Sequence, residues 1–158
     1  MRNLNQLIIK FDYEQNFKDD DFYVSESNKH IFKLLNNWPM WEKNFLNICG
    51  DQFSGKTHLI NIFLKKFNGI KLVSNEITND DLKKIKLYEN IVLEDLDENV
   101  DEKLIYTLFN IIDQDNKFIV VTSKKSIVNI NFSLPDLKSR SNNFLLQNIE
   151  KPDDDLMF

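Results

Sequence analysis

Eight consecutive residues, Gly50 to Thr57, constrain the fold of this chain more than any other segment. They read G-D-Q-F-S-G-K-T, and they contain two of only three glycines in 158 residues. A loop with this spacing between a strand and a helix gathers backbone N–H groups around a phosphate, and the lysine and hydroxyl complete the site. The segment is therefore interpreted as a phosphate-binding P-loop, and it predicts a strand–loop–helix unit.

The residues on both sides of the loop fit this unit. Residues 45–49 read FLNIC, as a buried strand would, and residues 58–67 have helical apolar spacing. We expect ADP or ATP with Mg²⁺ as the ligand, with Lys56 on the β- and γ-phosphates and the Thr57 hydroxyl on the metal. An ordinary strand–turn–helix without a ligand is the alternative. The expected nucleotide contacts are Gly50, Asp51, Gln52, Phe53, Ser54, Gly55, Lys56, Thr57 and His58.

The rest of the chain alternates short apolar strands with helices. Strands are expected at 70–73, 90–93, 117–123 and 144–146, and helices at 25–38, 79–86 and 102–113. Strands that are apolar almost throughout are typical of a parallel sheet buried on both faces. The sequence thus predicts an α/β fold, a three-layer P-loop NTPase domain with a parallel sheet.

Composition narrows the function classes. A chain of 158 residues with 42% hydrophobic residues suits one domain, and a net charge of −5 argues against nucleic-acid binding over the whole surface. Cys49, the one cysteine, is interpreted as a small buried hydrophobe. No apolar run approaches ~18 residues and no cationic, apolar leader opens the chain, so we expect no membrane span and a cytoplasmic location.

Acidic residues follow the strand expected at 90–93. The segment Ile91 to Asp95 reads IVLED, the Walker B pattern of apolar residues and then acids. Glu94 is expected to hold the metal through its water shell, and Asp95 to polarise the attacking water. The next apolar strand ends in Thr122-Ser123. These two residues either sense the γ-phosphate or make ordinary strand-end hydrogen bonds.

Segments over most of the chain resemble the AAA+ domain of the DnaA/Hda family, which contains the bacterial replication initiator and its shorter Hda-type regulators. Residues 21–28, DFYVSESN, are similar to the family's adenine-side box, which implies that Phe22 and Val24 contact the nucleotide. Residues 37–39 with 47–50 resemble the Hda approach to the P-loop, and residues 93–97 resemble its Walker B.

The segment at 134–140, LPDLKSR, resembles the part of the family that carries its arginine finger. The resemblance implies that Arg140 acts in trans, stabilising charge at the nucleotide of a neighbouring subunit. A surface arginine at a loop end is the alternative interpretation.

The N-terminal segment at 6–11, QLIIKF, is similar to the peptide with which Hda and other replication proteins bind the DNA polymerase sliding clamp. The implied clamp contacts are Gln6, Leu7, Ile9 and Phe11. An extended tail of this kind inserts alternate apolar side chains into a pocket. An edge strand is the alternative. The implied organisation is a clamp-binding tail at 1–20, an AAA+ base domain at 21–150 and the start of a truncated lid at 151–158.

Three features depart from the family. Glu94 stands where the initiator usually has aspartate, and Lys124 occupies the sensor position after Thr122-Ser123, where the initiator has an acid. The sequence ends at Phe158, where the helical lid would begin. We expect the lid to be absent or truncated and the site to be open, with weak or no intrinsic turnover.

The resemblance implies an Hda-like regulator of replication initiation, which binds the clamp and stimulates ATP hydrolysis by DnaA. Its partners would be the clamp and DnaA, with DNA contacted only indirectly, nucleoid association through the clamp, and a homodimer as an option. Two alternatives stay open. One is a stand-alone ATPase of the initiator or helicase-loader type acting on DNA, and the other is a degenerate nucleotide-binding domain without turnover.

Overall fold

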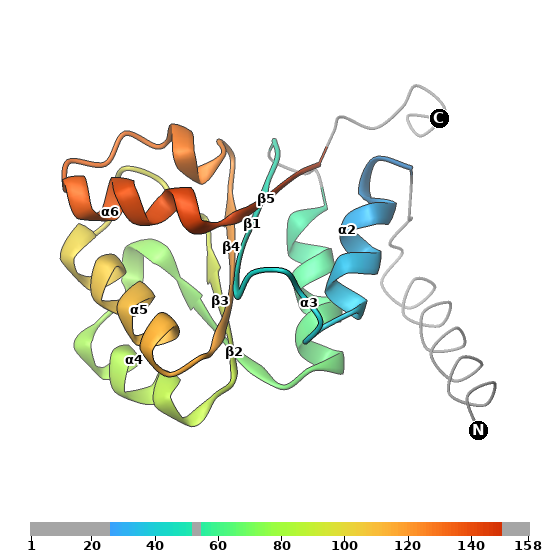
Figure 1. The fold of residues 1–158 in the computed structure, drawn as a ribbon, viewed down its shortest axis with the longest axis horizontal. Coiled ribbons are helices and arrows are strands. Elements are labelled where there is room, and N and C mark those ends of the chain that lie inside the picture. Colours follow the sequence, from blue (N-terminus) through green and yellow to red (C-terminus); the bar gives the residue numbers. More distant parts are fainter. Residues whose placement is uncertain (1–25, 52–54, 150–158) are drawn as a thin grey trace.

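A computed structural model describes residues 26–51 and 55–149. Five strands form one parallel sheet between two layers of helices (Figure 1). The strand order is β2-β3-β4-β1-β5, so the strand before the P-loop lies inside the sheet, between β4 and β5. The predicted three-layer α/β fold with a parallel sheet is confirmed. The strands are β1 (Phe45–Cys49), β2 (Gly69–Val73), β3 (Asn90–Glu94), β4 (Phe118–Ser123) and β5 (Leu145–Asn148).

Helices cover both faces of the sheet (Figure 1). On one face lie α2 (Glu26–Asn36) and α3 (Lys56–Lys66), and on the other lie α4 (Asn79–Lys84), α5 (Glu102–Gln114) and α6 (Pro135–Arg140). Within the described residues, no helix is long and apolar enough to cross a membrane. Short 3-10 turns join these elements: η1 (Ser74–Glu76), η2 (Ile85–Leu87), η3 (Ile127–Asn129) and η4 (Ser141–Asn143).

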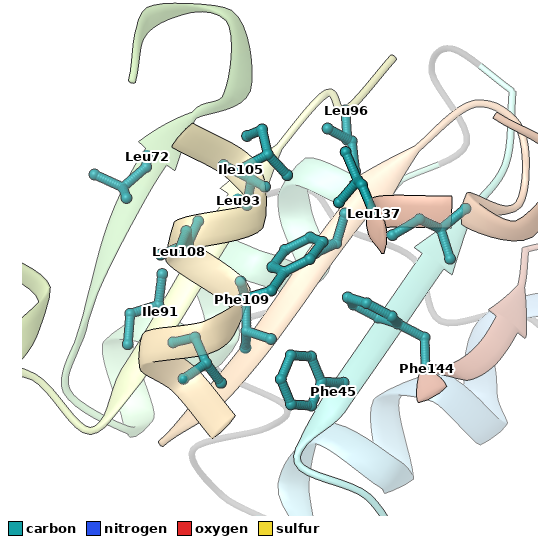
Figure 2. Packing of buried hydrophobic residues seen from close by; sticks show 14 of the residues in the cluster. Phe45, Leu72, Ile91, Leu93, Leu96, Ile105, Leu108, Phe109, Leu137 and Phe144 are labelled. Atoms are coloured by element: carbon teal, nitrogen blue, oxygen red, sulfur yellow. The ribbon is translucent and has the colours of Figure 1, made fainter. Parts of the chain in front are cut away.

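Alternation along the strands divides the core into two halves. Ile91 and Leu93 of β3 pack toward α5, whereas Val92 between them packs with α2 and α3. On the α5 side, the rings of Phe45, Phe109 and Phe144 meet edge-on, with centroids 5.2 to 6.1 Å apart (Figure 2). Because helices pack on both faces of the sheet, the strands are held in place. The residues of the candidate site at the ends of these strands are therefore held in place too.

The observed elements differ from the predicted ones mainly at their ends. The helix expected at 25–38 ends at Asn36, and a hydrogen-bonded turn leads to Pro39. The helix expected at 79–86 is shorter, because η2 replaces its last turn. β5 starts after Phe144, because pairing with β1 sets its register while the Phe144 ring packs in the core. Phe22 and Val24 of the adenine-side box, the N-terminal tail at 1–20 and the lid segment at 151–158 lie outside the described residues.

Candidate functional site

The P-loop begins where β1 leaves the sheet. The Gly50 N–H donates to the carbonyl of Ser123 at 3.1 Å, which ties the first residue of the loop to the end of β4. At the other end, Gly55 has φ 101°, a left-handed conformation that glycine adopts without a steric penalty. Its carbonyl accepts from the Leu59 N–H at 3.1 Å, in the first turn of α3. Gln52, Phe53 and Ser54 lie outside the described residues.

Lys56 is the first residue of α3, and it is only 8% exposed. Its ammonium donates to the carbonyls of Gly50 and Asp51, the latter at 2.9 Å. Burial lowers the pKa of Lys56 below its ordinary value, while the negative charges of Asp95 and Asp51 act in the opposite direction. The positive charge of Lys124 adds to the lowering. The P-loop lysine therefore lies on the loop, within electrostatic range of the acid that follows β3.

Two side chains on the α3 side of the sheet, those of Thr57 and Glu94, carry oxygen atoms that could hold Mg²⁺. Thr57 is exposed in the first turn of α3. Glu94 shares the sheet face of Val92, which packs with α3, and its side chain is 13% exposed beside the Lys71 ammonium at 3.7 Å. Among the described residues no three His, Cys, Asp or Glu side chains form a metal cluster. A hydroxyl, a carboxylate and phosphate oxygens together are a donor set that fits Mg²⁺.

Asp95 is held at the end of β3 by its backbone. It has φ 59°, and its N–H donates to the Thr122 hydroxyl at 3.0 Å. Its carbonyl accepts from the Ser74 hydroxyl at 2.6 Å, and the Leu96 N–H donates to the Thr122 carbonyl at 2.9 Å. Aspartate tolerates a left-handed backbone better than most residues. These bonds fix the backbone of Asp95 while its side chain stays exposed.

Ser123 is buried, and its hydroxyl is used within the protein. It accepts from the Asn47 amide at 3.0 Å and donates to the Lys125 carbonyl at 2.5 Å. Asn47, fully buried in β1, also donates to the Val121 carbonyl at 3.0 Å and accepts from the Ile127 N–H at 2.9 Å. The bonds of Thr122 and Ser123 are of the strand-end kind that the sequence offered as the alternative to a phosphate sensor. The sequence analysis did not predict this role of Asn47. A single polar residue within the apolar strand FLNIC was the one indication that its side chain makes buried hydrogen bonds.

A pocket of about 490 Å³ lies at the carboxyl ends of β3 and β4, where Lys56 forms part of its wall. Charged residues of both signs line it. The Lys125 ammonium pairs with the Glu98 carboxylate at 2.9 Å, and this hydrogen bond lowers the pKa of Glu98. Ligands of open α/β sheets bind at this edge. The complete lining is Lys56, Asp95, Leu96, Asp97, Glu98, Lys124, Lys125 and Ile130.

Arg140 lies at the opposite end of the strands, near the amino-terminal end of β1. Its guanidinium pairs with the Asp113 carboxylate at 3.3 Å, donates to the Asn110 side chain, and is 6.0 Å from the ring centroid of Phe45. Phe45 is the first residue of β1, and at ~3.3 Å per residue the strand carries the chain roughly 16 Å to Gly50. Arg140 and the P-loop of the same chain therefore belong to different sites.

Together the sheet order, the loop and the pocket define the class: this is an α/β P-loop fold, and it matches the fold of the AAA+ domain of DnaA. The AMPPCP-bound DnaA of Aquifex aeolicus is similar, with a TM-score of 0.68 at 19% identity over 83% of this chain and 49% of that chain. Domain III of Thermotoga maritima DnaA gives 0.67 at 18% identity over 86% and 68%. A putative primosome component from Streptococcus pyogenes gives 0.62 at 13% identity over 82% of each chain.

The chain spans about half the length of the Aquifex DnaA structure. No protein-family model and no curated protein matches the sequence. At these identities the likeness establishes the fold, and function has to be argued from the residues of the site.

Proposed function

We propose that this chain is a nucleotide-binding AAA+ module that regulates replication initiation by stimulating ATP hydrolysis on DnaA. The observation that carries the proposal is the separation of its two cationic sites. Lys56 and Asp95 share a pocket at the carboxyl edge of the sheet, whereas Arg140 lies at the opposite edge. A module built in this way can bind one nucleotide itself and present an arginine to the nucleotide of a neighbour.

Within its own site, each P-loop residue has a defined task. The N-terminus of α3 attracts the phosphates of ADP or ATP, and Lys56 exchanges its carbonyl contacts for phosphate oxygens. Thr57 and Glu94 would hold Mg²⁺, which neutralises phosphate charge. Asp95 would orient a water molecule. Because Asp95 depends on Thr122 for its backbone position, the strand-end bonds support this role.

Arg140 would act on the partner's nucleotide. Its side chain is 19% exposed and is held by Asn110 and Asp113, so reaching a phosphate requires these contacts to be exchanged for the new anion. Asn110 is neutral, and Asp113 is 61% exposed, so solvent weakens the ion pair that would be lost. In exchange, Arg140 would form a charge-assisted hydrogen bond to a phosphate.

The clamp-binding tail at 1–20, the base domain at 21–150 and the lid start at 151–158 belong to the same proposal. Recruitment to the sliding clamp through Gln6, Leu7, Ile9 and Phe11 rests on the sequence resemblance. It would place the module near DnaA on DNA, in the cytoplasm, without direct DNA contact. Alanine at both Gln6 and Leu7 should abolish capture of the chain by immobilised clamp, whereas Gln15→Ala should not. Equal capture of all three forms would remove the clamp from the proposal.

Nucleotide binding is tested by the affinities of fluorescent ADP and AMPPCP for the wild type and for Lys56→Ala. We expect Lys56→Ala to weaken binding by about tenfold or more, because a charge-assisted contact is lost. Lys65→Ala, at an exposed position on the same helix, is the matched control and should bind as the wild type does. Equal affinities for the wild type and Lys56→Ala would count against the P-loop assignment.

A second candidate is a helicase-loader type ATPase that acts on DNA, and the likeness to the primosome component favours it. This candidate requires turnover by the isolated chain, lost in Lys56→Ala, together with DNA affinity. A degenerate domain is the third candidate. It requires thermal stabilisation by nucleotide with neither turnover nor any effect on hydrolysis by DnaA.

A further inference from the structure

The two helical layers of the domain carry opposite charge. Residues 26–51 and 55–73, which include α2 and α3, contain seven lysines and three acids, a net charge of +4. Residues 74–149, which include α4, α5 and α6, contain nine cations and thirteen acids, a net charge of −4. A chain with a net charge of −5 therefore concentrates its positive charge on one layer.

The lysines of this layer gather on the exposed side of α2 and α3, which lie side by side (Figure 1). We call this surface the basic face and define it by Lys29, Lys33, Lys65 and Lys66. Neither helix contains an acid after Glu26. Within the described residues, Lys33 and Lys65 have no ion pair. A groove of about 490 Å³ lies along α3, and its described lining is His58, Asn61, Leu64 and Lys65.

The basic face offers charge but no large exposed apolar side chain. Such side chains among the described residues are Met40, Val73, Leu87 and Leu146, and none of them belongs to α2 or α3. Tight protein interfaces usually centre on buried aromatic or apolar side chains. A face of this kind suits an acidic, polar segment that is held by charge and released by salt.

We propose that the acidic segment at 12–21 of the same chain binds the basic face. The segment reads DYEQNFKDDD, with five acids and one lysine, a net charge of −4. It lies outside the described residues. Its charge is opposite to that of the α2 and α3 layer and equal in sign to that of the α4, α5 and α6 layer. Electrostatics therefore attract it to the first layer and repel it from the second.

The connection to α2 favours this segment over a free anion. Asp21 is five residues before Glu26, where α2 begins. A residue spans at most ~3.6 Å, so these five residues reach up to ~18 Å, and the 11 residues of α2 extend ~16 Å. The acids can thus reach both ends of the basic face. A short tether also gives an effective concentration on the order of mM.

This docking would set the side from which the proposed clamp-binding peptide leaves the domain. The peptide at 6–11 directly precedes Asp12, so it would leave beside α2 and α3. Arg140 belongs to α6, in the opposite layer. The clamp and DnaA would then meet different faces of the module. This consequence rests on the proposed function, whereas the docking itself does not.

A zero-length carbodiimide joins a carboxylate to an amine in contact with it, and so it tests the docking in the full chain. We expect mass spectrometry to find crosslinks from the aspartates at 19–21 to Lys33 or Lys65. They should largely disappear in ~1 M salt, where the screening length falls to ~3 Å. Lys103 and Lys138, exposed in the opposite layer, are the control amines and should stay at background. Equal crosslinking of both pairs of lysines would overturn the docking.

Trypsin cleavage after Lys18, inside the acidic segment, gives an independent measure. We expect Lys33→Glu combined with Lys65→Glu to speed this cleavage about threefold or more, because two attractive charge pairs become repulsive. Lys103→Glu combined with Lys138→Glu changes the net charge equally and should leave the rate unchanged. All four positions are exposed, so thermal melting should confirm that the variants fold. Equal rates in the two double variants would overturn the docking.

Two other occupants give different crosslinks. In a mixture of ¹⁵N-labelled and unlabelled protein, crosslinks between the two forms would assign the basic face to a second copy and overturn the proposal. Crosslinks from the aspartates at 153–155 in place of those at 19–21 would do the same in favour of the C-terminal segment. If the expected crosslinks form but immobilised clamp does not capture the chain, the docking stands and only its consequence for the clamp is lost.

Discussion

Replacing Asn47 with alanine should destabilise the protein far more than a typical asparagine substitution does. Asn47 is 0% exposed in a central strand, and its side chain makes three hydrogen bonds of 2.9 to 3.0 Å. Each contributes about 1 kcal/mol net, so their loss costs about 3 kcal/mol. The Ile127 N–H is also buried, and the substitution leaves it without its acceptor. A loss of this size lowers the Tm of a domain of this length by ~6–12 °C.

The assay is urea denaturation followed by circular dichroism, with the free energy of unfolding taken from the midpoint and slope. Asn61→Ala is the matched control. Asn61 is exposed on α3 and accepts one hydrogen bond of 3.4 Å from Lys71, so its loss should stay within ~0.5 kcal/mol. A loss below about 1 kcal/mol for Asn47→Ala, or equal losses for the two variants, would refute the reasoning from buried hydrogen bonds.

Three further substitutions test the supports of the site. Thr122→Val removes the acceptor of the Asp95 N–H and should cost about 1–2 kcal/mol in denaturant unfolding; no change would show that the bond does not hold Asp95. Gly55→Ala forces a side chain into φ 101° and should cost about 1–2 kcal/mol and weaken ADP binding, unless titration with fluorescent ADP finds wild-type affinity. Glu102→Ala releases two backbone N–H groups before α6, and thermal melting should register a loss of about 1–2 kcal/mol rather than none.

Much of the fold followed from local sequence pattern. The strand at 45–49 was predicted with its observed ends, because its apolar run stops at Gly50, the first residue of the P-loop. The strand expected at 90–93 was placed to within one residue, because two acids follow its apolar run, and β3 includes the first of them, Glu94. β5 was placed less well. Its start depends on which residues pair with β1, almost one hundred positions earlier, and no local pattern encodes that pairing.

The candidate site divides in the same way. The place of Lys56 on the phosphate-binding loop could be predicted from the motif alone, because each position of the motif has a defined chemical role. The partners of Asn47 were not readable, since they lie more than seventy positions away and become neighbours only when β4 pairs beside β1. The contacts of Arg140 with Asn110 and Asp113 likewise depend on how α5 packs beside α6, which the separate helical patterns do not specify.

The most direct test of the proposed regulation is ATP hydrolysis by DnaA in the presence of clamp loaded on DNA. We expect the wild-type chain to accelerate this hydrolysis and Arg140→Ala to abolish the acceleration while binding its own nucleotide as before. Lys138→Ala, at an exposed position on the same helix, is the control and should accelerate hydrolysis as the wild type does. Hydrolysis that is unchanged by the wild-type chain, or accelerated equally by Arg140→Ala, would contradict the account.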